Sequence, residues 1–448
     1  MHTNNGFKGI VVGGGPVGLT AAHALGRANI DFVLLESRPS PVVDAGGSLV
    51  LLPMGLRTFD QLGLRSSLDQ VSSSLGHIYR QDHLGQDIGE ALWFQLIKQS
   101  FGSAPAVLSR HDLTKVLYDT LPETSQSKII PNSKVSNITT NENGVEVTCA
   151  DGSSYQGSIV IGADGAHSIV RQQMRNLALN ANSEQVNDEK PYLTTFQALW
   201  LRMPTSVTGL EAGVTSETHG PNAATQLFSA EDTTVLGLYE KLDKPTRERV
   251  RFTKDDEAAL VERWGHLPLV PGGKLSLKEA FAARTESGLV SLEEGVVDHW
   301  SYDGRIVLTG DAAHKFTPST GSGCNNGIVD VVALTNELYT AVQKANGATP
   351  SKAQLTEAFE SYQASRKAPV TDACQRSGQA TATATWQTGL HKFMDKYVLA
   401  SQYVQKFISS RGGSKGAETK MGFLESGESL SEKMPWEKPE QTMPTRVI

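Results

Sequence analysis

The segment FKGIVVGGGPVGLTAAHALGRANIDFVLLESR, residues 7–38, constrains the fold more than any other stretch of the chain. Residues 7–12 form a short apolar run, residues 16–27 have helical composition, and residues 31–35 form a second apolar run. Two short apolar runs separated by one helix predict a βαβ unit with parallel strands. We therefore expect an α/β fold that begins with a Rossmann-type nucleotide-binding unit.

Glycines are spaced as GxGxxG at Gly13, Gly15 and Gly18, directly between the first expected strand and the helix. In this context the first glycine permits a tight turn, the second lets the backbone approach a pyrophosphate, and the third lets helix and strand pack closely. Glu36 follows at the end of the next strand and would accept hydrogen bonds from ribose hydroxyls, with Arg38 beside it in the same cofactor site. Because an acidic residue disfavours a 2′-phosphate, the pattern favours FAD or NAD over NADP.

Length and charge narrow the class of protein. A chain of 448 residues is long enough for two interlocked domains. Its 41 basic and 48 acidic residues give a formal net charge of -7, without a dense basic block, which argues against a nucleic-acid partner. Cys149, Cys324 and Cys374 are too few and too widely spaced to suggest a disulfide framework or a metal site. With no secretory signal and no apolar stretch long enough to cross a bilayer, we expect a cytoplasmic protein.

The middle of the chain predicts sheet structure. Residues 135–165 have the pattern of a β-meander, with hairpin signals at Asn143-Gly144 and Asp151-Gly152. Between about 186 and 290, strand-like pieces and a charged helical stretch predict a mixed-sheet domain inserted into the first domain. The expected organisation is a discontinuous nucleotide-binding domain at residues 1–75, 106–185 and 298–375, a substrate domain at 76–105 and 186–297, C-terminal helices at 376–411, and a loosely ordered tail at 412–448.

The stretch TGLHKFMDKYVLASQYVQKFIS, residues 388–409, predicts an amphipathic helical region. Its apolar residues recur near helical spacing and define one face, made of Leu390, Phe393, Met394, Tyr397, Val398 and Ile408. We expect this face to dock on the helix's own domain. Peripheral contact with a membrane surface and a subunit interface are the alternatives, so both a monomer and a homodimer remain open.

Two further motifs each follow an expected strand. IGADGAHSIVR, residues 161–171, places Asp164 at a tight strand-to-helix junction. GDAAHKFTPSTGSGCNN, residues 310–326, follows an apolar run and contains one proline and two further glycines. Taken alone, the first motif fits a capped turn, and the second opens with a common Gly-Asp turn pair. Their meaning therefore depends on their combination with GxGxxG.

Together the three motifs resemble, in order and spacing, the signature of the flavoprotein monooxygenases related to 4-hydroxybenzoate hydroxylase. Several segments look like a fungal branch of that family, the FAD-dependent epoxidases and monooxygenases of indole-diterpene, meroterpenoid and prenylated-indole alkaloid biosynthesis. Those segments are DAGGSLVLLPMGLRTFDQLGL (44–64), LSRHDLTKVLYD (108–119), LYEKLDKPTRERVRFTKDD (238–256), GDAAHKFTP (310–318) and GAETKMGFLESGES (416–429). The resemblance implies a Rossmann-type FAD-binding domain, an inserted mixed-sheet substrate domain and a helical C-terminal region.

The resemblance also implies which residues hold FAD. The GxGxxG and Gly-Asp segments would bind FAD, and the Asp-Gly segment would serve both FAD and the reduced nicotinamide cofactor. Asp311 would accept a hydrogen bond from a ribityl hydroxyl, while backbone N–H groups at the start of the next helix would face the isoalloxazine edge. The other implied contacts are Gly46, Gly47, Arg110, Asp164, Pro318, Gly321, Gly323 and Cys324.

The activity implied by the resemblance is that of an FAD-dependent monooxygenase. NADPH or NADH would reduce FAD, O2 would form a flavin C4a-hydroperoxide, and one oxygen atom would epoxidise or hydroxylate a small hydrophobic secondary metabolite, a prenylated indole alkaloid or meroterpenoid. The protein would position this substrate, exclude water and supply a proton. His314 and Tyr239 are the catalytic candidates, each with an ordinary structural role as its alternative.

Two other activities fit the same fold. A flavin oxidase or dehydrogenase would form H2O2 without inserting oxygen, and a non-catalytic module would hold FAD that NAD(P)H never reduces. Ser319 and Ser322 bear on the reaction type, because many relatives have Asn and Gln at these positions beside the flavin. No second GxGxxG occurs, which argues against a reductase with two nucleotide-binding domains.

Overall fold

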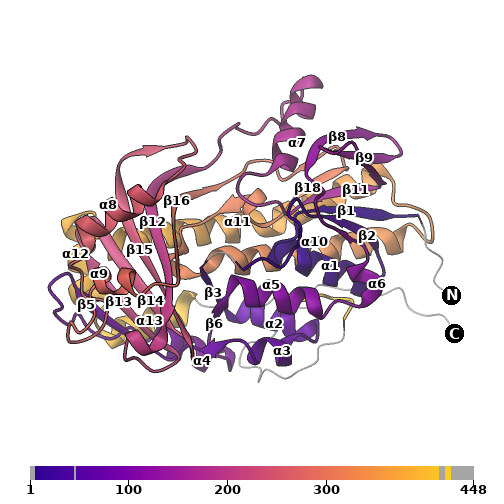
Figure 1. The fold of residues 1–448 in the computed structure, drawn as a ribbon. Helices are drawn as coiled ribbons and strands as arrows, with labels where there is room; N and C mark the ends of the chain where they lie inside the picture. The colour runs from indigo at the N-terminus through magenta and orange to yellow at the C-terminus, as the bar shows by residue number, and fades with distance from the viewer. Residues whose placement is uncertain (1–5, 45–46, 413–418, 425–448) are drawn as a thin grey trace.

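The computed structural model describes residues 6–44, 47–412 and 419–424, and has two parts with one long helix running between them (Figure 1). One part is built on a mostly parallel sheet and the other on a large mixed sheet, with helices in the C-terminal region. The expected α/β fold class is therefore confirmed. Gly46 and most of the predicted tail lie outside the described residues.

The first part contains a six-stranded sheet, which we call the Rossmann sheet. Its strand order is β17-β18-β11-β1-β2-β7, and every neighbouring pair except β17 and β18 is parallel. Helices α1 (Pro16–Arg27) and α10 (Ser322–Lys344) pack against each other in this part. The strands are β1 (Lys8–Val12), β2 (Asp31–Leu35), β7 (Ile129–Ile130), β11 (Ile159–Gly162), β17 (Ser301–Tyr302) and β18 (Ile306–Leu308).

Two small antiparallel sheets and several helices surround the Rossmann sheet. The predicted meander is confirmed as β8 (Val135–Asn141), β9 (Gly144–Cys149) and β10 (Ser154–Gly157), with turns at both expected Asx-Gly pairs. The second sheet consists of β3 (Ser48–Leu51), β4 (Ser73–Ser74) and β6 (Ala106–Ser109). The helices are α2 (Pro53–Gln61), α3 (Arg65–Asp69), α5 (Arg110–Asp119), α6 (Glu123–Gln126) and α7 (Ile169–Asn180).

The second part is built on seven strands in the order β19-β16-β12-β15-β14-β13-β5, which we call the large sheet. One face packs its leucines, such as Leu199 and Leu238, against helices α8 (Lys254–Trp264) and α9 (Leu277–Ala282). The alternate residues form the opposite face, because side chains alternate along a strand. The strands are β5 (His77–Asp82), β12 (Leu193–Pro204), β13 (Val214–Gly220), β14 (Ala223–Ser229), β15 (Thr233–Thr246), β16 (Glu286–Val296) and β19 (His314–Lys315), and α4 (Trp93–Phe101) follows β5.

Helix α11 (Lys352–Ala384) runs between the two parts (Figure 1). It contacts α10 in the first part and strands β13, β14 and β16 in the second. It also contacts the short 3-10 turn η3 (Pro318–Thr320), which lies inside the Gly-Asp motif segment. This single helix therefore sets the position of that segment relative to both sheets.

The C-terminal region after α11 comprises α12 (Gly389–Phe393), the π-helical turn η4 (Met394–Val398) and α13 (Gln402–Gly412). The expectation that this apolar face docks on its own domain is wrong, since Leu390, Phe393, Tyr397 and Ile408 are between 43% and 67% exposed. Asp395 is buried in their place, at 1% exposure. Helical spacing predicted an apolar face, but the contacts that bury this segment are polar ones to strands far away in the sequence. Within the described residues, no helix is long and apolar enough to cross a membrane.

A chain of alternating buried charges joins this region to the large sheet. Asp395 accepts hydrogen bonds from Arg80 of β5 and from Trp386 Nε1, the latter at 2.8 Å. His219 of β13 lies between two carboxylates, with Nδ1 2.9 Å from Asp395 Oδ2 and Nε2 3.2 Å from Glu217 Oε2. Burial alone would lower the pKa of His219, but the Asp395 and Glu217 carboxylates outweigh it and raise the pKa to about 9.

This raised pKa predicts how stability changes with pH. Because the folded-state pKa of His219 exceeds the ordinary value of 6.5, its contribution is fully present below pH 6.5 and is lost as pH rises through about 9. We expect the unfolding free energy to fall by on the order of 2 kcal/mol over this interval in the wild type. His219→Gln should be less stable at pH 6.5 and should show a flatter pH dependence, measured by urea unfolding.

His77→Gln is the matched control, since His77 is exposed on the neighbouring strand β5 and pairs with Glu90 at the surface. It should keep the wild-type slope. An equally steep loss in His219→Gln would show that other groups produce the pH dependence.

Candidate functional site

The sequence motifs converge at one edge of the Rossmann sheet. Strands β18, β11, β1 and β2 are neighbours and run parallel, so their carboxyl ends lie side by side. Gly13 follows β1, Glu36 follows β2, Asp164 follows β11 and Gly310 follows β18. In open α/β sheets, ligands bind outside the carboxyl ends of the strands. The structure thus brings all three motifs together where a nucleotide would be held.

Backbone packing explains two of the three GxGxxG glycines. Gly13 has φ +105°, and a Cβ there would lie 2.5 Å from Ala163 O. A Cβ on Gly18 would lie 1.9 Å from Gly13 O, so helix α1 can approach the turn only with glycine at this position. Gly15 differs, since its nearest neighbour in the described part is Arg110 Nη2 at 3.6 Å. Because only this flexible side chain lies within 4 Å among the described residues, Gly15 leaves room for a pyrophosphate beside the N-terminus of α1.

Glu36 is buried at the end of β2 and faces the glycine turn. Its Oε2 accepts a hydrogen bond from Gly14 N at 2.6 Å, and its Oε1 accepts bonds from the backbone N and Nε of Arg38 at 2.8 and 2.9 Å. Burial would raise the pKa of Glu36, but these hydrogen bonds and the Arg38 charge outweigh it and lower the pKa. Glu36 is therefore an ionised acceptor, which suits ribose hydroxyls.

The Asp-Gly motif forms the turn from β11 into α7. Asp164 accepts hydrogen bonds from Ser168 Oγ at 2.5 Å and Val170 N at 3.1 Å, and burial raises its pKa. Arg171 of the same helix donates from Nη1 to Ala312 O at 2.8 Å. This bond ties the second motif to the third, so the two motifs act as one structural unit.

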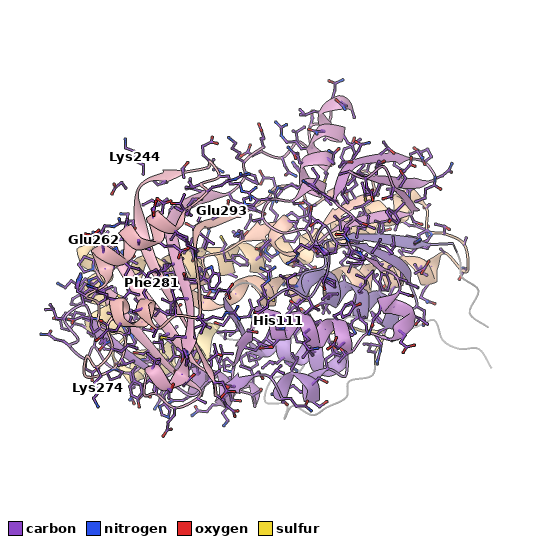
Figure 2. All side chains as sticks on the ribbon, in the orientation of Figure 1. His111, Lys244, Glu262, Lys274, Phe281 and Glu293 are labelled. Carbon is purple, nitrogen blue, oxygen red and sulfur yellow. The ribbon has the colours of Figure 1, made fainter. Side chains whose placement is uncertain are left out.

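The Gly-Asp motif turns sharply after β18. Gly310 has φ +56°, and a Cβ there would lie 3.1 Å from Val17 Cγ2. The side chain of Asp311 is 43% exposed and lies 3.9 Å from Lys315 Nζ, which also pairs with Glu293 of β16 at 3.3 Å. Figure 2 shows Glu293 where the large sheet approaches the Rossmann part. Asp311 thus remains open to a ligand hydroxyl, as a ribityl contact requires.

The start of α10 presents backbone donors to the same edge. Gly321 adopts the left-handed conformation at φ +65°, and no side chain in the described part caps the helix here. Asn325 holds the turn by donating from Nδ2 to Val50 O and Gly321 O, each at 2.7 Å. Burial raises the pKa of the Cys324 thiol to about 12, so Cys324 stays protonated. Free amides at a helix N-terminus favour negative charge, which suits a reduced flavin.

A buried ion cluster lies directly behind the Gly-Asp turn. Asp330 of α10 accepts hydrogen bonds from His314 Nε2 at 2.5 Å, Arg366 Nε at 2.8 Å and Gly310 N at 3.0 Å. Burial would raise the pKa of Asp330, but His314 and Arg366 lower it to about 2. Because His314 is completely buried, the geometry favours its structural alternative over proton transfer at the flavin.

Tyr239 lies on the face of the large sheet opposite α8 and α9. Its hydroxyl donates to Gln226 Oε1 at 2.9 Å, and Gln226 Nε2 donates to Glu217 Oε1 at 2.8 Å and to Ser319 O at 3.3 Å. Burial, with a smaller effect of the Glu217 charge, raises the pKa of Tyr239. Gln226 therefore links the predicted catalytic tyrosine to the segment that precedes α10.

Several residues of this site belong to no motif or spacing pattern that a single sequence would reveal. Asp330, Arg366, Asn325 and Gln226 act through partners distant in the chain. His111 is another: Figure 2 shows it at the start of α5, and its Nδ1 is buried without a hydrogen-bond partner among the described residues.

These donors and acceptors fit FAD. The N-terminus of α1, with room beside Gly15, suits the pyrophosphate, and the ionised Glu36 suits the ribose. The accessible Asp311 suits the ribityl chain, and the amides at the start of α10 suit the isoalloxazine edge. The fold and this edge define a Rossmann-type flavoprotein.

The chain matches the FAD binding domain family over residues 7–377 and belongs to that family. FAD-dependent monooxygenase srdH of Neurospora crassa is 36% identical over 81% of this chain and 83% of its own length. FAD-dependent monooxygenase dpchE of Colletotrichum higginsianum is 34% identical over 78% of this chain and 75% of its own length. The protein is an FAD-dependent monooxygenase, as the motifs predicted.

Solved structures share the fold at low sequence identity. The p-nitrophenol 4-monooxygenase PnpA from Pseudomonas putida superposes with a TM-score of 0.70 at 19% identity, covering 90% of this chain and 97% of PnpA. HpxO of Klebsiella pneumoniae, solved with FAD and uric acid, has a TM-score of 0.69 at 19% identity and covers 90% of this chain and 96% of HpxO. At such identities the likeness establishes the fold alone.

The different surroundings of Gly15 and Gly18 give a paired prediction. Gly18→Ala should destabilise the apoprotein by about 1–3 kcal/mol, because the added methyl group collides with Gly13 O. Gly15→Ala should leave the apoprotein as stable as the wild type but weaken FAD binding at least tenfold, because the methyl group would occupy space beside the pyrophosphate. Thermal unfolding of the apoproteins and FAD fluorescence titration measure the two effects. Wild-type FAD affinity in Gly15→Ala would place the pyrophosphate elsewhere.

Proposed function

We propose that this protein uses NADPH or NADH and O2 to epoxidise or hydroxylate a small hydrophobic secondary metabolite, of the prenylated indole or meroterpenoid type. The observation that carries the proposal is the convergence of the three motifs at the carboxyl ends of neighbouring parallel strands. The names of the fungal relatives support oxygen insertion as the reaction class. Bound FAD would accept hydride from the nicotinamide and supply the oxygen atom from O2.

The face of the large sheet opposite α8 and α9 supports a hydrophobic substrate. Phe196, Ala198, Tyr239 and Leu292 form an apolar cluster there. Trp200 continues the same face toward the Rossmann part, since a Cβ on Gly47 would lie 4.0 Å from Trp200 Cβ. A substrate between this face and the start of α10 would bury its apolar surface and leave its reactive carbon near the flavin.

The polar groups at the margin of that face would orient the substrate. Tyr239 keeps its proton at neutral pH, because its pKa is raised, and its hydroxyl is directed to Gln226. We therefore assign Tyr239 to hydrogen bonding with substrate rather than to action as a base. His314 is assigned to holding Asp330, and through it the Gly-Asp turn that carries Asp311.

Anaerobic reduction of the bound flavin tests this proposal. We expect NADPH or NADH to bleach the flavin absorbance of the purified FAD-loaded protein, and one member of a panel of prenylated indoles and meroterpenoid precursors to accelerate the bleaching. Re-oxidation with ¹⁸O-labelled O2 should then introduce one labelled oxygen atom into that compound, detected by mass spectrometry.

Other outcomes identify the alternatives. Bleaching by a candidate substrate but by neither nicotinamide would assign an oxidase or dehydrogenase. Stoichiometric H2O2 without labelled product, in the presence of an accelerating compound, would contradict oxygen insertion. A flavin that no nicotinamide or panel compound reduces would contradict the proposed chemistry altogether.

A further inference from the structure

Six hydroxyl side chains form one connected cluster behind the start of α10. Three lie on the segment that leads into α10, one is the first residue of α10, and two lie on α11. We call these residues the hydroxyl cluster: Thr317, Ser319, Thr320, Ser322, Ser377 and Thr381. Three of them, Thr317, Ser377 and Thr381, are completely buried. Because a buried hydroxyl is costly unless it is paired, these contacts constrain the segment strongly.

Both hydroxyls of α11 reach the turn η3 and its flanks. Ser377 Oγ donates to Thr317 O at 2.7 Å and lies 2.7 Å from Thr320 Oγ1. Thr381 Oγ1 lies 2.6 Å from Ser319 Oγ and 2.9 Å from Thr317 Oγ1. The turn is therefore held to α11 at three consecutive hydroxyl-bearing positions around Pro318.

The direction of these hydrogen bonds follows from proton counting. Ser377 has one hydroxyl proton, and it goes to a carbonyl oxygen, which only accepts. Thr320 must then donate to Ser377, and Ser322, whose Oγ lies 2.7 Å from Thr320 Oγ1, must donate to Thr320. This series of hydrogen bonds, from Ser322 through Thr320 and Ser377, ends on the backbone carbonyl of Thr317, which has no proton to donate. The hydroxyl cluster is thus suited to fixing the segment in place and not to transferring protons.

The segment that is fixed carries the groups assigned to the isoalloxazine edge. It leads directly through Gly321 into the uncapped start of α10 within the described chain. Ser319 and Ser322, the two positions where this sequence departs from the Asn and Gln of many relatives, both belong to the hydroxyl cluster. The departures therefore have a structural consequence: both side chains are short enough to pair with a hydroxyl of α11 or of the turn.

We propose that Ser377 and Thr381 are positioning residues for the flavin, which act by holding the Thr317–Ser322 segment so that the first amides of α10 stay beside the isoalloxazine. The inference rests on the proposed placement of FAD at this edge. Neither residue touches the cofactor in this arrangement, and both act through the segment. Loss of either hydroxyl leaves buried partners unpaired and lets the segment move.

The test compares FAD binding and flavin properties in the full-length protein. Thr381→Val removes the hydroxyl and keeps the shape of the side chain. We expect it to weaken FAD binding about tenfold in fluorescence titration, and to shift the midpoint potential and the visible circular dichroism of the remaining bound flavin. Thr381→Ser, which restores the hydroxyl, should recover all three properties. Thr320→Val removes the contact that the turn makes with Ser377, together with the contact to Ser322, and provides a second variant if Thr381→Val folds poorly.

Thr385→Val is the matched control. Thr385 lies one turn after Thr381, at the C-terminal end of α11, and is completely buried. Among the described residues, its hydroxyl donates only to Thr381 O and Ala382 O of α11. It should leave the flavin properties unchanged.

The outcomes separate this inference from the proposed function. FAD affinity, potential and dichroism in Thr381→Val and Thr320→Val that match the wild type would overturn the inference and reduce the hydroxyl cluster to helix packing. Equal flavin changes in Thr385→Val would overturn it as well, since general loosening of α11 would explain them. A wild-type protein that binds no FAD would instead overturn the placement of the cofactor.

Discussion

The hydrogen bonds to the Asp330 carboxylate hold together the edge of the Rossmann sheet where the motifs converge. This carboxylate is completely buried in α10, and an unpaired charge at that depth would cost several kcal/mol. Its three hydrogen bonds come from Gly310 at the end of β18, His314 of β19 and Arg366 of α11. One charge therefore holds three elements in a single arrangement: the Gly-Asp turn, the edge strand β19 of the large sheet, and helix α11, which runs between the two parts.

In the large sheet, too, buried charges are stabilised by opposite charges beside them. The positive Arg80 and His219 alternate with the negative Asp395 and Glu217, so each charge has an opposite neighbour. Through Gln226 this chain reaches both Tyr239 and the segment before α10. Charged pairs thus fix the positions of the elements around the site, and the apolar cluster of Phe196, Ala198, Tyr239 and Leu292 lies on the same face of the sheet.

Local patterns predicted much of the fold and the nucleotide side of the site. The βαβ unit, the meander and the role of Gly18 depend on turns and contacts within a few tens of residues. Each motif also follows a strand, and parallel strands place their carboxyl ends at one edge. The convergence of Glu36, Asp164 and the Gly-Asp turn was therefore accessible from the order of strands and motifs, before any contact was known.

By itself, the sequence determined that this chain binds a nucleotide on a Rossmann-type unit, because glycine conformation and strand-to-helix geometry are local properties. Only the tertiary structure decided which polar groups are buried and with whom. Arg366 lies 36 residues from Asp330, Ser377 lies 60 from Thr317, and Asp395 lies 176 from His219. The C-terminal segment shows the reason: its helical spacing predicted an apolar contact face, yet the polar residues Asp395 and Gln405 are buried there. Whether a side chain is buried depends on the partners that the fold brings to it, and spacing along one helix carries no information about residues on distant strands.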